Sequence, residues 1–197
     1  MGNWNHNKGK KITVEPIRDK KKIEAMKAYL KGKNLRNYLL FVLGLNTGLR
    51  ISDLLELKYS DIFTENNNFR EHLTIKEEKT EKTKKIKLNN AARKSLKEYM
   101  SVYYLTGNDY LFKSKKGGRI TRVQAYRILT EAAKTVGIED FGTHSLRKTW
   151  GYWTYSASRY NIGLIMDMFN HSSPAITLRY VGINQDQKDE LYSMVQL

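Results

Sequence analysis

Cysteine is absent from this 197-residue chain, and proline occurs only twice. Without cysteine the protein can form no disulfide, no thiol nucleophile and no thiolate metal site, a composition that fits the cytoplasm. Long apolar runs are also missing: none reaches the roughly 18–20 residues that span a bilayer, and the first 30 residues lack the apolar core of a signal peptide. These absences argue against a secreted or membrane-spanning protein.

Acidic residues are scarce relative to basic ones. The chain has 35 Lys and Arg against 20 Asp and Glu, a formal net charge of +15. Such a charge attracts polyanions, of which nucleic acid is the commonest, with an anionic membrane surface or an acidic protein as alternatives. The basic residues cluster in 1–36, 76–97 and 113–127, whereas 181–197 is slightly acidic. Nucleic-acid binding is therefore the first functional expectation.

The apolar spacing predicts a mainly helical α+β domain with a small antiparallel sheet. A chain of this length that is 40% hydrophobic can build one core. Gly48 is a plausible helix end, and Ser52, Thr143 and Ser173 are plausible N-caps. Two β-leaning segments, 72–76 and 84–88, read as a hairpin, and 109–112 as a short strand. Helices are expected near 20–31, 35–46, 52–58, 90–105, 121–136, 143–156 and after Pro174.

Two arginines stand where a helix begins. Arg50 follows the break at Gly48, and its guanidinium could grip a phosphate through two parallel hydrogen bonds. The alternative for Arg50 is an ion pair with Asp53 at the helix start. His144 and Arg147, three residues apart, project from one face of a helix N-terminus, where the helix dipole favours an oxyanion.

A histidine, a tyrosine and several lysines complete the candidate residues. His171 lies in a turn before a capped helix, and Tyr180 lies near that helix's end. A tyrosine nucleophile needs positive charge around it, because the phenol pKa is near 10. Most of the 13 tyrosines must nevertheless be structural. A lysine of the hairpin turn, Lys79 or Lys82, could donate a proton to a leaving oxygen, although most lysines in such a run are solvated or touch phosphates.

In the order Arg, Lys, His-x-x-Arg, His, Tyr, these residues resemble the tyrosine recombinase (phage integrase) family. The most specific stretches are TGLRISDLLELKYSDI (47–62), THSLRKT (143–149) and NHSSPAITLRYVG (170–182). The resemblance implies a catalytic domain over 13–183, after a flexible basic N-terminus (1–12). The segment 184–197 would form a C-terminal helix that docks on a neighbouring subunit or packs on its own domain. Phe169-Asn170 replaces the family's common Leu-Gly pair.

The resemblance also implies a role for each candidate residue. Arg50 and Arg147 would clamp the scissile phosphate, and Asp53 would buttress Arg50. His144 and His171 would hydrogen-bond the non-bridging oxygens. Lys79 would be the general acid, with Lys82 as the alternative, and Tyr180 the nucleophile of a 3′-phosphotyrosyl intermediate. No cofactor, metal or ATP is expected.

The function implied is that of a site-specific DNA recombinase of a phage or mobile element. Its partners would be double-stranded DNA carrying a recombination site and further recombinase subunits, with a monomer in isolation and a tetramer on DNA, and no membrane. A type IB topoisomerase and a non-catalytic DNA-binding regulator are the alternatives. Only about 20 residues precede the first predicted helix, where the family usually has a DNA-clamping domain. We therefore expect either a catalytic fragment or a short recombinase similar to the fimbrial invertases.

Overall fold

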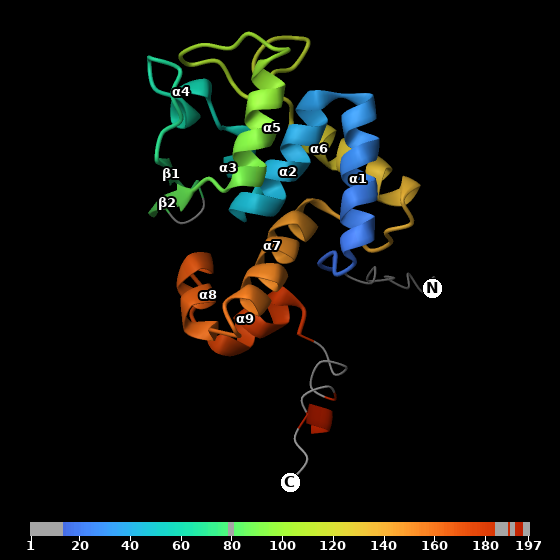
Figure 1. The fold of residues 1–197 in the computed structure, drawn as a ribbon. Helices are drawn as coiled ribbons and strands as arrows, with labels where there is room; N and C mark the ends of the chain where they lie inside the picture. The colour runs from blue at the N-terminus through green and yellow to red at the C-terminus, as the bar shows by residue number, and fades with distance from the viewer. Residues whose placement is uncertain (1–13, 79–80, 184–188, 190–191, 195–197) are drawn as a thin grey trace, which may run out of the picture.

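The described part of the chain consists of nine helices and one β-hairpin (Figure 1). The computed structural model describes residues 14–78, 81–183, 189 and 192–194. The helices are α1 (Lys20–Lys33), α2 (Leu35–Thr47), α3 (Ile51–Leu55), α4 (Tyr59–Ile62), α5 (Asn90–Met100), α6 (Arg122–Thr135), α7 (Thr143–Ala157), α8 (Ile162–Phe169) and α9 (Pro174–Val181). The strands β1 (His72–Lys76) and β2 (Thr83–Lys87) pair antiparallel.

Helix α2 lies at the centre of the larger core, where it packs against α1, α5 and α7. It ends at Gly48 in the left-handed conformation (φ 63°), as expected from the sequence. A side chain at Gly48 would also collide with the ring of Trp150. Glycine is therefore required here both by its backbone angle and by the close approach of α7. This turn fixes Arg50 at the entrance to α3.

The hairpin stands beside α3 and above α8 (Figure 1). Its register pairs Leu73 with Ile86 and Ile75 with Lys84. Because side chains of a strand alternate between two faces, Leu73, Ile75 and Glu77 share one face. Leu73 and Glu77 are both fully buried, so this face is turned inward.

Helix α7 runs from the larger core to a smaller one formed by α8 and α9 (Figure 1). Ile165, Phe169 and Val181 are fully buried there, and Trp150 and Tyr180 pack against them. Helix α8 ends at Asn170 in the left-handed conformation (φ 56°). The side chain of Ser173 caps α9, as the sequence predicts. This cap and turn set the positions of His171 and Tyr180.

The fold class is confirmed, and several boundaries are not. Helices α4 and α8 were not predicted, the expected helix 90–105 ends at Met100, and the expected helix 52–58 ends at Leu55. Ser52 and Thr143 are not N-caps; Arg50 and Gly142 hold those positions. The predicted strand 109–112 makes a single bridge, from Tyr110 to Lys58. None of the described helices is long and apolar enough to cross a membrane.

Candidate active site

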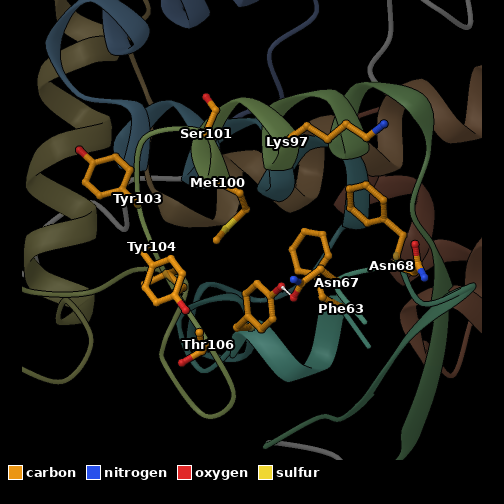
Figure 2. A pocket seen from close by; sticks show the side chains of 12 residues that line it. Phe63, Asn67, Asn68, Lys97, Met100, Ser101, Tyr103, Tyr104 and Thr106 are labelled. Carbon is orange, nitrogen blue, oxygen red and sulfur yellow. Dashed lines mark hydrogen bonds between the residues drawn. The ribbon is translucent and has the colours of Figure 1, made fainter. Parts of the chain in front are cut away.

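One large pocket lies away from every candidate residue. It has a volume of about 610 Å³ and opens between α4, α5 and the segment that follows α5 (Figure 2). Its walls are aromatic rings and amides, and the hydroxyl of Tyr59 donates a hydrogen bond to Asn67 within it (2.6 Å). A second cavity, of about 520 Å³, is lined by Lys84, Arg147 and Asn170. Two of the charged groups that suit phosphate chemistry, Lys84 and Arg147, therefore line this second cavity.

Arg50 forms its ion pair with a residue that was not expected from the sequence. Its Nη1 lies 2.8 Å from Oε1 of Glu77, and its side chain is 19% exposed. Asp53 is buried and instead accepts a hydrogen bond from the backbone N–H of Glu78 (3.1 Å). Burial raises the pKa of Asp53, and the charges of Arg50 and Arg147 oppose this shift. Arg50 is therefore held by the hairpin.

Arg147 is almost completely buried, at 4% exposure. It donates from Nη1 to the carbonyl of Gly48 (2.6 Å) and from Nη2 to the carbonyl of Phe169 (3.3 Å). Its guanidinium also lies over the ring of Phe169, 4.7 Å from the centroid. Burial lowers the pKa of Arg147, while Tyr180 and Glu77 favour its charged form. These contacts fix the guanidinium in one orientation.

Glu77 lies at the centre of the cations. Its side chain is fully buried, and Oε1 lies 2.8 Å from Arg50, 3.0 Å from Nζ of Lys84 and 3.6 Å from Nη1 of Arg147. Asn170 donates to Oε2 (3.3 Å). Lys84 also donates to the carbonyl of Met168 (2.7 Å). Burial lowers the pKa of Lys84, and the hydrogen bond to Glu77 raises it.

Neither Glu77 nor Lys84 was predicted as a site residue, although the sequence carries a signal for each. Glu77 continues the alternation of Leu73 and Ile75, and Lys84 shares a face with Ile86. Period-two alternation alone places both ionic side chains on the inward face of the hairpin.

Tyr180 and His171 adjoin the arginine cluster. Their ring centroids are 5.1 Å apart, and Nδ1 of His171 lies 3.0 Å from Oγ1 of Thr177. Burial raises the pKa of the Tyr180 phenol, and the charge and hydrogen bond of Arg147 lower it. Burial, followed by the charges of Arg147 and Arg50, lowers the pKa of His171. The phenol therefore lies against the guanidinium that favours its ionisation.

The remaining candidates are His144 and the two hairpin lysines, Lys79 and Lys82. His144 lies in the first turn of α7 and is partly exposed; the burial of the rest of the residue, and then the charges of Arg147 and Arg122, lower its pKa. Lys79 lies outside the described residues, and Lys82 is exposed at the end of the hairpin turn. The choice between these lysines stays a prediction. Among the residues that the structure describes, no group of three or more His, Asp and Glu could hold a metal ion.

The structure thus brings Arg50, Arg147, His171 and Tyr180 together from segments far apart in the chain. Preorganised cations of this kind stabilise negative charge that develops on an oxyanion, and they act most strongly where water is excluded. A phenol held beside a buried guanidinium is suited to nucleophilic attack. The arrangement fits phosphoryl transfer through a tyrosine.

Comparison with known proteins agrees with this chemistry. Residues 12–187 match the phage integrase family. The chain is 43% identical over 182 residues to the probable integrase/recombinase YoeC of Bacillus subtilis (strain 168), covering 92% of this chain and 96% of YoeC. It is 28% identical over 150 residues to the type 1 fimbriae regulatory protein FimE of Escherichia coli (strain K12), covering 76% of this chain and 75% of FimE.

Solved structures share the fold. The crystal structure of the XerH site-specific recombinase, bound to palindromic difH substrate in a post-cleavage complex, aligns with a TM-score of 0.72 at 23% identity. The alignment covers 92% of this chain and 52% of the XerH chain. The chain also spans about half the length of the XerC and XerH recombinases that it matches in sequence. From the family match over most of its length and its identity to YoeC, the chain belongs to the phage integrase family of tyrosine recombinases.

Proposed function

We propose that this chain is a site-specific DNA recombinase catalytic domain that cuts and rejoins strands through Tyr180. The observation that carries the proposal is the contact between the Tyr180 phenol and the buried guanidinium of Arg147, with Arg50 and His171 in the same cluster. The proposed catalytic domain is 13–183. We propose that 184–197 docks on a neighbouring subunit; of this segment the structure describes only 189 and 192–194.

Cleavage would proceed by attack of the Tyr180 oxygen on phosphorus. The bond from phosphorus to the 5′-oxygen breaks, and a 3′-phosphotyrosyl bond forms. Arg50 and Arg147 would neutralise the charge that builds on the non-bridging oxygens, with hydrogen bonds from His144 and His171. The phenol proton can pass to His144, whose lowered pKa favours the neutral imidazole. A hairpin lysine, Lys79 in our proposal, protonates the departing 5′-oxygen.

Rejoining reverses these steps. A 5′-hydroxyl from another strand attacks the phosphotyrosyl phosphorus and releases Tyr180. The covalent bond preserves the energy of the phosphodiester, so no ATP is required.

The substrate would be double-stranded DNA carrying a recombination site, and the DNA assembly a tetramer. A surface lined by Arg36, Lys113, Lys115, Lys116 and Arg127 surrounds a cavity of about 660 Å³ and is suited to the phosphates of a flanking duplex. Because the substrate would be DNA of this kind, we propose that the protein, encoded by a bacterium or a phage, acts in the host cytoplasm.

The test is covalent capture on nicked duplexes. A nick next to the cleavage point lets the short 5′-hydroxyl fragment leave, so that the protein–DNA adduct accumulates. We would incubate the protein with a pool of nicked duplexes of randomised sequence, enriched for members that it binds, and separate the products by denaturing electrophoresis. We expect an adduct with the wild type and none with Tyr180→Phe. An unchanged adduct in Tyr180→Phe, or no adduct with the wild type, refutes the proposal.

Recombination and topoisomerase activity differ in whether cleavage requires an enriched DNA sequence. Relaxation of supercoiled plasmids that lack any enriched sequence would favour the type IB topoisomerase alternative. Binding without any adduct would favour a non-catalytic regulator.

A further inference from the structure

A single buried carboxylate connects the hairpin to both arginines. Glu77 is the residue directly after β1, and its backbone closes the hairpin turn: its N–H donates to the carbonyl of Lys82 (3.0 Å), and its carbonyl accepts from the N–H of Glu81 (2.9 Å). Its side chain points the other way, into the arginine cluster, and is 0% exposed. The same residue therefore shapes the turn and contacts the phosphate-binding groups.

Four elements meet at this carboxylate. Arg50 comes from the entrance to α3, Lys84 from β2, Arg147 from α7 and Asn170 from the end of α8. A carboxylate holds several donors in fixed directions because it has two oxygens with about four acceptor sites. Here Oε1 forms ion pairs with Arg50, Lys84 and Arg147, and Oε2 accepts the amide hydrogen bond of Asn170. Loss of the carboxylate would release Arg50 and the hairpin together.

The local charge also suits one phosphate group. Arg50, Arg147 and Lys84 carry three positive charges, and Glu77 and Asp53 carry two negative charges within electrostatic reach. Among these five described groups one positive charge is left over, and one phosphodiester would neutralise it. Without Glu77 the excess would be two, and the three cations would repel one another.

We infer that Glu77 is a positioning residue for strand cleavage, which holds Arg50, Lys84 and the β1–β2 turn in the geometry that receives the scissile phosphate. It acts through these groups and does not itself contact DNA, since it is buried beneath them. This inference rests on the proposed function.

The test compares Glu77→Gln with Glu78→Gln. Both variants remove one carboxylate without changing side-chain length, but Glu78 is exposed, and in the described contacts it takes part through its backbone N–H. For each variant we would measure the affinity for enriched nicked duplex and the single-turnover rate of adduct formation at saturating protein. Melting temperature and hydrogen exchange at the amides of residues 77 and 81 would be measured in parallel.

We expect Glu77→Gln to bind DNA at least as tightly as the wild type, because the site becomes more positive. Its adduct rate should fall about 10²-fold, the loss that follows a misplacement of reacting groups by about 1 Å. Exchange at the amides of residues 77 and 81 should rise. Glu78→Gln should match the wild type in all four measurements.

An adduct rate of Glu77→Gln equal to that of the wild type overturns the inference. So does a loss of affinity in proportion to the loss of rate, since general damage to the fold lowers both. If Glu77→Gln melts below the assay temperature, Asn170→Gly provides the test: it removes the amide contact to Oε2 and suits the positive φ of that position. Asn170→Gly should slow adduct formation with unchanged affinity; a wild-type rate overturns the inference. A wild type that forms no adduct refutes the proposed function instead, so the two failures are distinguishable.

Discussion

Replacing Arg147 by lysine separates its observed role as an anchor of the fold from its proposed role as a donor to phosphate. Its guanidinium donates hydrogen bonds to the carbonyls of Gly48 (2.6 Å) and Phe169 (3.3 Å), and it contacts the phenol of Tyr180. A lysine keeps the positive charge but carries a single nitrogen at the end of a shorter side chain. It cannot reproduce a planar fork with donors in several directions.

The magnitude follows from these contacts. Leaving one buried carbonyl without its donor costs about 1–3 kcal/mol. In a domain of this size, each kcal/mol lowers the melting temperature by about 2–4 °C. The loss of a preorganised donor to the developing oxyanion lowers the rate by about 10²–10³-fold. The Arg147→Lys variant should therefore fold but form the adduct more slowly than the wild type.

The assay is single-turnover adduct formation on nicked duplex, together with thermal unfolding monitored by circular dichroism. Arg159→Lys is the matched control, because Arg159 is exposed in the turn between α7 and α8. It should leave both measurements unchanged. A lowered melting temperature with a wild-type adduct rate in Arg147→Lys would mean that Arg147 is only an anchor, and would refute the reasoning.

Two further predictions concern pH and a glycine. Because the pKa of His171 is lowered in the folded protein, the folded state binds fewer protons than the unfolded state just below the ordinary histidine pKa. The stability that comes from the neutral form of His171 is complete above the ordinary histidine pKa. It is lost as pH falls from there through the lowered pKa, so the melting temperature should decline over this interval. His171→Asn should flatten the decline in thermal melts, and an unchanged slope would contradict the cause. Gly48→Ala should destabilise the protein by more than about 1 kcal/mol, because its positive φ and the Trp150 ring both oppose a side chain. In denaturant titration, Gly32→Ala, in open space within α1, should be neutral or stabilising, and equal effects of the two substitutions would refute the explanation.

The candidate residues could be predicted from the sequence because each lies in a local pattern. Arg50 follows a helix-ending glycine, and His171 precedes a capped helix whose end carries Tyr180. These patterns depend on short-range backbone preferences, which the sequence states directly. Helix α8 was missed because its eight residues are mostly apolar, and a short apolar run does not distinguish a helix from a strand or a loop.

The contacts among these residues could not be predicted in the same way. The partner of Arg50 was expected three residues along the chain, at Asp53, whereas the structure places Glu77 there. That pairing depends on the hairpin folding back against α3, a tertiary contact with no local signature. The run of charged residues around the hairpin turn also reads as solvated, which hides the two members that face inward.

The two buried carboxylates, Glu77 and Asp53, change how the strong positive charge of the chain should be understood. A site built from arginine and lysine alone would hold its cations apart by mutual repulsion, most severely where burial removes the screening of water. Glu77 and Asp53 offset that repulsion before DNA binds, so the cations can be preorganised without substrate. Preorganisation is the condition under which charged donors accelerate a reaction rather than merely tighten binding. In the proposed function, the excess of lysines and arginines on the surface attracts the duplex, while the chemistry would depend on a cluster whose charge is nearly balanced.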